Sequence, residues 1–548
     1  MLGSALPLDA RPEHTAYRPG EEVAVLVDAS AEGSVELRLT HLGDLVAERR
    51  VDVTTGRTRI SLGDLPTGAY AVRLAAAAGT ACTAVEVLEH PLSRPRYGFV
   101  SDFAPGRADL PTLAALTDSL RAFHLNVVQF YDWMYRHAQL LPPGDVRTAT
   151  APDEFDDALG RRLSLRTVRG LVHAVHAAGA QALGYAAVYG AGVDYAEAHP
   201  DQVLHHRDGT PWGLAGFLTI MDVTPGSPWV EHIVGQASAA VSAVPFDGLH
   251  LDQYGSPQVA LTAAGETVDL AQALPALVDA VRDAIPDATL IFNNVNDFPT
   301  ARSAHARQDV TYIEVWSPHD THADLVDLVG RARGVAPQRP VVLAAYLEPF
   351  ATAGGPAEVA AATLALATVW AAGGQYLLFG EVGAVLCDPY YVRHAVLSAE
   401  ARTELRRFVD FSVANGDLLF DTSALETTSS MAGGINEDVV VTGAPVSLRP
   451  QAGSVWLRTS AVGSRLLVQL VDFRGQEDGR WNAPRSPVQP ATGVRLRLRV
   501  VARHPRVRFG HPGAGTELVD LPVTDDLGDD VVVDLPEFTT WALILVDR

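Results

Sequence analysis

The chain has 548 residues, of which 47% are hydrophobic and 20% are charged, and its formal net charge is −23. A chain of this length folds into more than one domain, and its apolar content is sufficient for full cores and excludes wholesale disorder. The excess of acidic residues repels the phosphates of nucleic acids and of anionic membrane surfaces. We therefore expect neither nucleic acid nor a membrane as a partner, and the charge is compatible with a neutral substrate.

The cysteines and the catalogue of common motifs limit the cofactors that the chain can hold. Cys82 and Cys387 fall in regions that we predict to be different domains, so they can build neither a disulfide framework nor a thiolate metal site. His173 and His176 lie three residues apart on a predicted helix but lack a third ligand. The sequence contains no P-loop, dinucleotide fingerprint, nucleophile-elbow serine or His-Glu-x-x-His motif, so phosphoryl, hydride and acyl transfer have no support. We expect no cofactor and no metal.

No targeting segment is evident. Residues 1–10 lack the basic start and the long apolar core of a signal peptide. The longest uncharged apolar stretch, residues 359–377, is rich in alanine and is interrupted by Gly373 and Gly374. It predicts a buried helix followed by a strand and not a membrane span. We expect a soluble, cytoplasmic chain unless an export signal has been removed, and the sequence leaves the oligomeric state open.

Residues 1–93 predict an immunoglobulin-like β-sandwich. Apolar and polar residues alternate in short segments separated by Gly- and Asp-bearing turns, for example at residues 22–27, 34–39 and 69–74. About seven such strands at a spacing of about 8–12 residues are typical of this sandwich. Residues 91–95, which begin and end with proline, predict a linker.

Residues 94–419 predict a (β/α)₈ barrel, the TIM-barrel fold. Eight strand candidates alternate with amphipathic segments, which is the pattern of parallel strands connected by helices. The strand candidates are residues 96–103, 125–132, 181–189, 248–253, 289–294, 310–316, 341–347 and 376–381. The helical candidates include residues 110–123, 165–178, 229–244, 268–284 and 357–371. A doubly wound open sheet is the alternative, but residues 101–106, after the first strand, lack the glycine-rich phosphate fingerprint of that fold.

Residues 420–548 return to strand-like alternation and predict a second β-sandwich, of Greek-key type. The strand candidates here are residues 454–459, 465–472, 493–501, 530–533 and 538–546. The expected fold is thus multidomain, with a central barrel between two β-sandwiches.

Two acidic residues lie where chemistry occurs in such barrels, at the carboxyl ends of the strands. The fourth strand ends at Asp252 and the sixth at Glu314, so their carboxylates would face each other across the barrel mouth, as glycoside hydrolysis requires. Asp252 has an alternative role as the cap of the next helix or as the partner of an arginine. Glu314 lies between Ile313 and Val315, where an unpaired carboxylate is costly to bury, which favours an acid with a raised pKa.

Other residues at strand ends are predicted to bind the substrate. Amides can bind sugar hydroxyls, and aromatic faces can cover the apolar side of pyranose rings. The candidates are Tyr131, Asp132, Trp133, His137, His250, Gln253, Tyr254, Asn294, Trp316, Tyr346 and Glu381. Glu348 and Glu381 are also alternatives for the acid, or members of structural salt bridges, and Asp247 is expected to close a turn at the start of the fourth strand.

With these motifs the sequence resembles glycoside hydrolase family 66, the endo-dextranases and cycloisomaltooligosaccharide glucanotransferases. The resemblance is carried by Gln-Phe-Tyr-Asp-Trp-Met-Tyr-Arg-His at residues 129–137, Phe-Asp-Gly-Leu-His-Leu-Asp-Gln at 246–253, Tyr-Ile-Glu-Val-Trp at 312–316 and Leu-Phe-Gly-Glu at 378–381. It implies the same order of three domains and retaining hydrolysis of α-1,6-linked glucan, either dextran or isomaltooligosaccharides. It also implies that Asp252 is the nucleophile and Glu314 the acid/base.

The sequence also departs from the family pattern. Cyclising members carry a carbohydrate-binding module inserted in the barrel region, whereas the seventh and eighth predicted strands are joined here by about 28 residues, which favours hydrolysis over cyclisation. Tyr254 and Met134 are unusual residues at their positions in the motifs. The sequence therefore predicts an α-glucan substrate more strongly than it predicts dextran itself. The lack of a signal peptide also fits poorly with digestion of an extracellular polymer.

The expected mechanism is a double displacement with the two carboxyl groups about 5–5.5 Å apart. The alternatives are an α-1,6 transglucosylase, an α-glycosidase acting on another linkage, and a non-catalytic glycan-binding protein on the same fold. Endo and exo action are not distinguished by the sequence.

Overall fold

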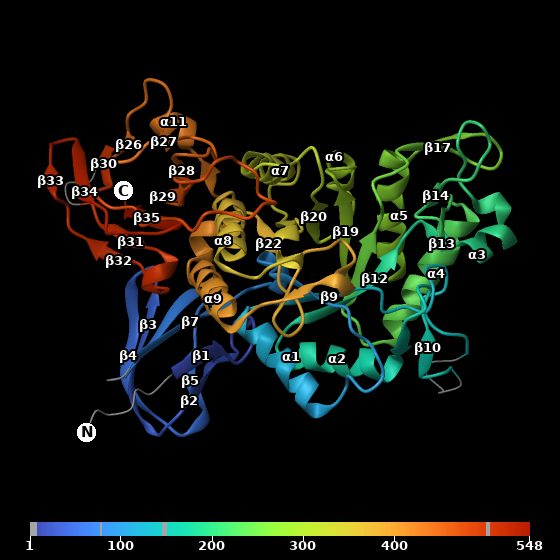
Figure 1. Ribbon diagram of the computed structural model, residues 1–548, viewed down its shortest axis with the longest axis horizontal. Helices are drawn as coiled ribbons and strands as arrows, with labels where there is room; N and C mark the ends of the chain where they lie inside the picture. Colours follow the sequence, from blue (N-terminus) through green and yellow to red (C-terminus); the bar gives the residue numbers. More distant parts are fainter. Residues whose placement is uncertain (1–7, 77–78, 145–150, 500–504, 548) are drawn as a thin grey trace.

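The computed structural model describes residues 8–76, 79–144, 151–499 and 505–547 (Figure 1). The N-terminal part consists of two antiparallel sheets, as predicted for a β-sandwich. The three-stranded sheet has the order β1-β2-β5 and the four-stranded sheet the order β4-β3-β6-β7. The strands are β1 (Leu8–Pro12), β2 (Glu22–Ala29), β3 (Gly33–His41), β4 (Asp44–Val53), β5 (Gly56–Asp64), β6 (Gly68–Ala76) and β7 (Gly79–Val87). Alternate residues such as Val25, Leu37 and Val72 form the core between the sheets, because successive side chains of a strand point to opposite faces.

The middle of the chain forms the predicted parallel barrel. Its strands follow the order β8-β9-β12-β16-β19-β20-β21-β22, and an isolated parallel bridge between Phe99 and Gly380 joins the last strand to the first. The backbone N–H of Glu381 also donates to the Phe99 carbonyl over 2.8 Å. The strands are β8 (Tyr97–Val100), β9 (Val127–Phe130), β12 (Gln181–Ala187), β16 (Gly248–Asp252), β19 (Thr289–Val295), β20 (Val310–Glu314), β21 (Val341–Ala344) and β22 (Gln375–Leu377). Each of the eight strand candidates within residues 94–419 therefore overlaps one strand of the barrel.

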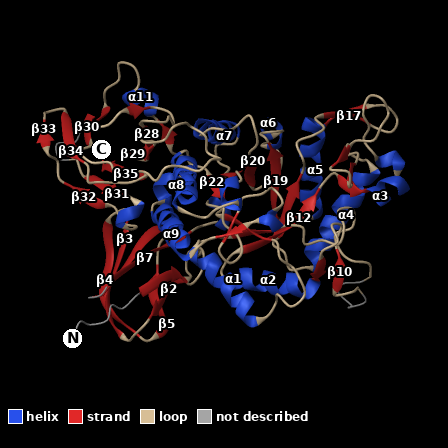
Figure 2. Cartoon of the chain, viewed as in Figure 1, coloured by secondary structure: helices blue, strands red, loops and turns tan. Residues whose placement is uncertain are grey.

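Helices cover the outside of the barrel (Figure 2). They are α1 (Leu110–Ala122), α2 (Leu165–Ala177), α4 (Pro228–Ala243), α5 (Leu270–Ala284), α7 (His322–Val335) and α8 (Pro356–Ala371). Local signals fix where they begin: the Ser164 side chain accepts from the Thr167 N–H at the start of α2, and Thr321 and Asp324 form a capping box at the start of α7. The five helical candidates of the sequence are confirmed within a few residues at each end.

Short elements occupy the loops between strands and helices. They are β10 (Glu154–Asp156), β11 (Arg162–Ser164), β13 (Gly190–Gly192), α3 (Val193–Ala198), β14 (Gly213–Leu214), β15 (Leu218–Ile220), β17 (Val259–Leu261), β18 (Thr267–Asp269), α6 (Thr300–Ser303), β23 (Ala384–Val385) and β24 (Ala395–Val396), with the 3₁₀ turns η1 (Pro91–Ser93), η2 (Pro200–Gln202), η3 (Glu348–Ala351) and η4 (Tyr391–Arg393). The loop segments after β12 and β16 therefore carry small sheets of their own above the barrel mouth.

The C-terminal part is the predicted second β-sandwich, preceded by α9 (Ala399–Ala414) and α10 (Gly416–Leu419). One sheet has the order β25-β28-β29-β35-β31-β32, with β27 paired to β28, and the other has the order β26-β30-β34-β33. The elements are β25 (Leu425–Glu426), α11 (Thr428–Ala432), β26 (Val439–Thr442), β27 (Val446–Ser447), β28 (Val455–Val462), β29 (Arg465–Asp472), β30 (Arg495–Arg499), β31 (Val507–Gly510), η5 (Pro512–Ala514), β32 (Val519–Leu521), β33 (Asp525–Asp526), β34 (Asp530–Asp534) and β35 (Trp541–Asp547). The end of the strand predicted over residues 493–501 lies outside the described residues.

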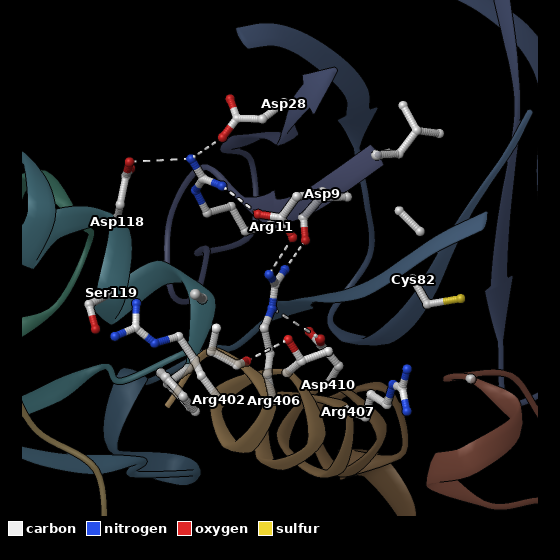
Figure 3. Close-up of a pocket in the computed structure, with 18 of the residues that line it drawn as sticks. Asp9, Arg11, Asp28, Cys82, Asp118, Ser119, Arg402, Arg406, Arg407 and Asp410 are labelled. Atoms are coloured by element: carbon white, nitrogen blue, oxygen red, sulfur yellow. Dashed lines mark hydrogen bonds and ion pairs between the residues drawn. The ribbon is translucent and has the colours of Figure 1, made fainter. Parts of the chain in front are cut away.

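Ion pairs join the N-terminal sandwich to the barrel (Figure 3). Arg11 of β1 contacts Asp28 of β2 at 2.6 Å and Asp118 of α1 at 3.2 Å. Arg406 of α9 contacts Asp9 at 2.5 Å and Asp410 at 3.4 Å. These residues line a polar cavity of about 970 Å³ between the sandwich, α1 and α9.

None of the helices in the described residues has both the length and the apolar character that a membrane span requires.

A buried carboxylate fastens the linker between the two domains. Glu86 of β7 is 1% exposed, and its two oxygens accept from Arg94 at 2.6 Å and from Arg96 at 2.5 Å. Arg96 also donates to the carbonyl oxygens of Thr15 and His124. One side chain thus connects the sandwich with the segment between α1 and β9 of the barrel.

Replacing Glu86 should destabilise the protein strongly. The Glu86→Ala variant leaves the buried Arg96 without a carboxylate and leaves Arg94 with Asp417 as its remaining acidic partner. The loss of one partner of a buried ion pair costs about 3–5 kcal/mol. We expect a matching decrease in the free energy of unfolding, measured by denaturant titration followed by circular dichroism. The exposed pair of Arg38 and Glu48 provides the control: Glu48→Ala should change stability by about 0.5 kcal/mol or less. Equal effects of the two substitutions would contradict the role of Glu86.

Candidate active site

Asp252 and Glu314 lie at the carboxyl ends of two barrel strands that flank a third. Asp252 ends β16, Glu314 ends β20, and β19 pairs with both strands. From β19, Asn293 Nδ2 donates to Asp252 Oδ1 over 2.7 Å and to Glu314 Oε2 over 2.7 Å. One amide group thus connects the two carboxylates, and we call Asp252 and Glu314 the acid pair.

This bridge limits how far apart the carboxylates are. Because both oxygens lie 2.7 Å from the same nitrogen, Asp252 Oδ1 and Glu314 Oε2 are separated by at most about 5.4 Å. Retaining glycosidases have carboxyl groups about 5–5.5 Å apart, whereas inverting enzymes need about 6.5–9.5 Å to admit a water molecule. The upper bound for these two oxygens lies below the separation that inverting enzymes need, which favours retention.

Each carboxylate also accepts a hydrogen bond from a tyrosine that does not contact the other carboxylate. Tyr185 of β12 donates its hydroxyl to Asp252 Oδ2 over 2.6 Å, and Tyr346, which follows β21, donates to Glu314 Oε1 over 2.6 Å. Both tyrosines are buried, and burial raises their pKa well above 10, so they remain neutral donors. The acid pair and its donors therefore come from five neighbouring strands of the barrel, β12, β16, β19, β20 and β21.

Burial raises the pKa of both acids. For Asp252 the negative charge of Glu314 raises the pKa further, while the hydrogen bonds from Tyr185 and Asn293 oppose the rise. For Glu314, hydrogen bonds from Tyr346, Asn293 and Trp316 oppose the effect of burial. Two buried carboxyl groups this close titrate as a unit, so the pair keeps one proton to a higher pH than an isolated carboxyl would.

Aromatic rings lie next to the acid pair. Tyr97 and His250 share a hydrogen bond of 2.8 Å, and burial lowers the pKa of His250 to about 3, so the imidazole is neutral. The hydroxyls of Tyr312 and Tyr391 lie 3.0 Å apart, and Tyr391 stacks on Tyr131 with ring centroids 4.3 Å apart. Tyr97, His250 and Tyr312 lie on barrel strands, whereas Tyr131 and Tyr391 lie on the loops that follow β9 and β22.

Several predicted substrate-binding residues lie in the barrel wall. Trp133 is fully buried, packs edge-on against Phe246 and donates its indole N–H to the Tyr185 carbonyl. Gln253 donates to the carbonyl oxygens of Asn293 and Phe298. The hydrogen bonds of these two side chains hold loops and strands in place.

Other candidates lie at the barrel mouth but away from the acid pair. Burial raises the pKa of Asp132 to about 7, partly offset by Arg161 at 3.9 Å, and burial lowers the pKa of His137 to about 4. Glu381 accepts from the Ser101 hydroxyl over 2.9 Å, and His394 Nδ1 lies 3.6 Å from its carboxylate. No hydrogen bond among the described residues joins these three candidates to the acid pair.

The other acidic candidates, Glu348 and Asp247, lie apart from the acid pair. Glu348 is exposed, and Asp247 lies before β16 at the opposite end of the barrel from Asp252, where it accepts from the Ala182 N–H and pairs with His176 at 2.9 Å. Within the described part of the chain, no cluster of histidine, cysteine, aspartate or glutamate has the arrangement of a metal site.

Tyr254 and Trp316 line an open cleft beside the acid pair. The cleft has a volume of about 400 Å³ and is bounded by the loops that follow β16, β19 and β20. Trp316 is 40% exposed, and its ring lies 5.6 Å from that of Tyr346. Tyr254 stacks on Tyr189 at 5.5 Å, and its backbone N–H donates to the Tyr189 hydroxyl. An exposed indole beside two acids can cover the apolar face of a sugar ring.

Asn293 and Tyr185 are not among the site residues predicted from the sequence. The predicted residue on this strand is Asn294, whose Nδ2 donates to the carbonyl oxygens of Phe292 and Tyr312 in the barrel wall. His250 and Asp252 face inward on β16, as do Ile291 and Asn293 on β19, so the inward side of β19 is recognised only once its register with β16 is known.

The sequence matches a family model and several curated proteins. The family model described as Glycosyl hydrolase family 66 matches residues 12–545. A cycloisomaltooligosaccharide glucanotransferase of Niallia circulans is 25% identical over 64% of this chain and 39% of its own length. A dextranase of Streptococcus salivarius is 22% identical over 82% of this chain and 63% of its own. The chain thus spans less than two thirds of the length of these curated relatives.

The fold has a close counterpart among solved structures. A cycloisomaltooligosaccharide glucanotransferase of Paenibacillus sp., complexed with cycloisomaltoheptaose, superposes with a TM-score of 0.89 at 18% identity, covering 98% of this chain and all of that one. An α-amylase of Geobacillus thermoleovorans, complexed with acarbose, superposes with a TM-score of 0.54 at 10% identity, over 84% of this chain and all of that chain. The arrangement of sandwich, barrel and sandwich is therefore shared with the first of these structures.

Removing the hydroxyl of Tyr346 should shift the basic limb of the pH profile of catalysis to higher pH. The hydroxyl stabilises the ionised form of Glu314, so Tyr346→Phe raises the pKa of that carboxyl. If Glu314 must be protonated to act, the basic limb of the plot of kcat/KM against pH moves to higher pH by about one unit. A basic limb that stays in place or moves to lower pH would exclude Glu314 as the acid.

Proposed function

Because the chain belongs to glycosyl hydrolase family 66, we propose that it is a retaining glycoside hydrolase that cleaves α-1,6-linked glucan, such as dextran or isomaltooligosaccharides. The observation that carries the proposal is the acid pair bridged by Asn293, with carboxylate oxygens at most about 5.4 Å apart. The names of the relatives, dextranase and cycloisomaltooligosaccharide glucanotransferase, support the choice of substrate.

The first step of the proposed mechanism forms a covalent glycosyl-enzyme. Glu314 donates its proton to the glycosidic oxygen as the bond to the anomeric carbon breaks, and Asp252 attacks that carbon from the opposite face. The burial that keeps a proton on the acid pair supplies the acid, while the hydrogen bonds from Tyr185 and Asn293 stabilise Asp252 as an anion. The leaving sugar departs as a neutral alcohol.

The second step returns the enzyme to its starting state. The ionised Glu314 takes a proton from water, and the resulting hydroxide attacks the anomeric carbon and releases Asp252. Two inversions give overall retention of configuration. In the cleft, Trp316 and Tyr254 would hold the sugar ring next to the acid pair.

Transglycosylation is the second candidate activity, because a sugar hydroxyl can replace water in the second step. The curated relatives include glucanotransferases, which favours this activity. The connection from β21 to β22 consists of η3, α8 and short loops, which leaves no room for an inserted domain there and supports hydrolysis over cyclisation.

Replacing the nucleophile should abolish turnover without unfolding the protein. Asp252→Asn keeps the size of the side chain but removes the attacking carboxylate, so we expect kcat on dextran to fall by about 10⁴-fold or more. Circular dichroism and binding of isomaltooligosaccharide, measured by calorimetry, should stay close to those of the wild type. Asp247→Asn is the matched control, since Asp247 occurs in the same motif but at the opposite end of the barrel, and it should retain activity. Substantial hydrolysis by Asp252→Asn would refute the assignment.

The anomeric form of the product tests retention directly. With dextran as substrate, proton NMR in the first minutes should show the α-anomer at the new reducing end before mutarotation. The β-anomer would indicate inversion and contradict the proposal. With excess isomaltose as acceptor, chromatography of the products measures the share of transglycosylation, and parallel incubations with starch and pullulan test other linkages.

A further inference from the structure

Asn293 and Asn294 are neighbours on β19 that use their amide groups in opposite ways. Asn294 Nδ2 donates to the carbonyl oxygens of Phe292 and Tyr312, and its Oδ1 accepts from the Ser303 hydroxyl. Asn293 Nδ2 instead makes both of its hydrogen bonds to the acid pair. Asn294 therefore fastens the barrel wall, whereas the amide nitrogen of Asn293 is engaged by the carboxylates.

The chemistry of the site fixes the orientation of the Asn293 amide. The reversed orientation would place Oδ1 against two carboxylate oxygens, which offer it no hydrogen, and both hydrogen bonds would be lost. In the observed orientation Oδ1 is buried and accepts no hydrogen bond within the described part of the chain. The acid pair thus provides the hydrogen bonds that hold this side chain.

We propose that Asn293 is the positioning residue that sets both the separation and the shared protonation of the acid pair, an inference that rests on the proposed function of Asp252 and Glu314. The two hydrogens of one amide nitrogen point in fixed directions, so a single group holds the two carboxylate oxygens at one spacing. Each N–H bond favours the ionised form of the carboxylate that accepts it. Asn293 therefore counteracts, on both acids at once, the rise in pKa that burial causes.

The other groups next to the acid pair donate to one acid or carry no charge. They are Tyr131 after β9, Tyr185 on β12, His250 and Tyr254 on and after β16, Tyr312 and Trp316 on and after β20, Tyr346 after β21 and Tyr391 in η4. Asp132, also after β9, is a titratable carboxyl whose charged neighbours are Arg161 and Asp157. Tyr185 donates to Asp252 alone and Tyr346 to Glu314 alone. Asn293 is distinguished from them because it donates to both.

The pH dependence of kcat/KM separates these roles. The acidic limb reports the base that must be ionised and the basic limb the acid that must be protonated. Tyr185→Phe should move the acidic limb to higher pH, and Tyr346→Phe the basic limb. Asn293→Ala should move both limbs to higher pH by about one unit each. Its kcat should fall by about 10- to 100-fold, the effect of losing a hydrogen bond to a charged group, with KM changed by about twofold or less.

Two further variants keep the test decisive. Asn293→Asp has nearly the size of asparagine and places a third carboxylate beside the pair, so both limbs should again move to higher pH. Asn294→Ala is the matched control: loss of its bonds to Phe292, Tyr312 and Ser303 should lower the melting temperature but leave both limbs in place. If Asn293→Ala and Asn293→Asp lower the melting temperature and leave the pH profile unchanged, Asn293 is a structural residue and the proposal is wrong.

A second measurement does not depend on turnover. Infrared titration follows the C=O band of protonated carboxyl groups, and the difference from Asp252→Asn identifies the contribution of the acid pair. We expect the midpoints of that contribution to rise in Asn293→Ala by the same amount as the kinetic limbs. Unchanged midpoints would overturn the proposal. If the wild type cleaves none of the glucans while these midpoints still shift, the proposed function fails and the positioning role of Asn293 stands.

Discussion

The structure of the active site depends on the cost of holding two carboxyl groups close together in a buried place. Burial and mutual repulsion both disfavour ionisation of Asp252 and Glu314. Hydrogen bonds from Tyr185, Asn293, Tyr346 and Trp316 offset that cost. The balance leaves one acid able to hold a proton and the other able to act as an anion, which are the two states that a double displacement needs at the start.

The rest of the barrel keeps those donors in register. Because β12, β16, β19, β20 and β21 are parallel neighbours, the carboxyl ends of all five open on the same side, and residues at matching positions meet there. Ala187 pairs with Asp252, and Val295 pairs with Glu314, so a slip of one residue in either register would turn one of the two carboxylates toward the barrel wall. The buried ion pairs of Glu86, Arg94 and Arg96 fasten the first strand of this barrel to the N-terminal sandwich.

The sequence predicted the strands and the two acids for the same reason. Apolar strands that end abruptly in polar residues mark the mouth of a barrel, so Asp252 and Glu314 stood out by position. The same signal could not separate Asn293 from Asn294, because the strands of a parallel barrel are buried on both faces and their residues show no apolar–polar alternation from which to read the inward side. The same limit applies to Trp133. An aromatic residue near a strand end predicts a surface on which a sugar ring can stack, whereas the ring of Trp133 packs against Phe246 in the barrel wall.

The choice between water and a sugar as the final acceptor cannot be made by the acid pair, because the same two carboxylates serve both reactions. It must be made by the surfaces that receive the acceptor. The cleft of Trp316 and Tyr254 is such a surface: it opens beside Glu314, the group that deprotonates the acceptor in the proposed second step. An aromatic wall there binds the face of a pyranose ring and gains little from a water molecule. In the proposed mechanism, Tyr254 and Trp316 therefore bear on the choice of the acceptor, whereas Asp252, Asn293 and Glu314 bear on the cleavage of the bond.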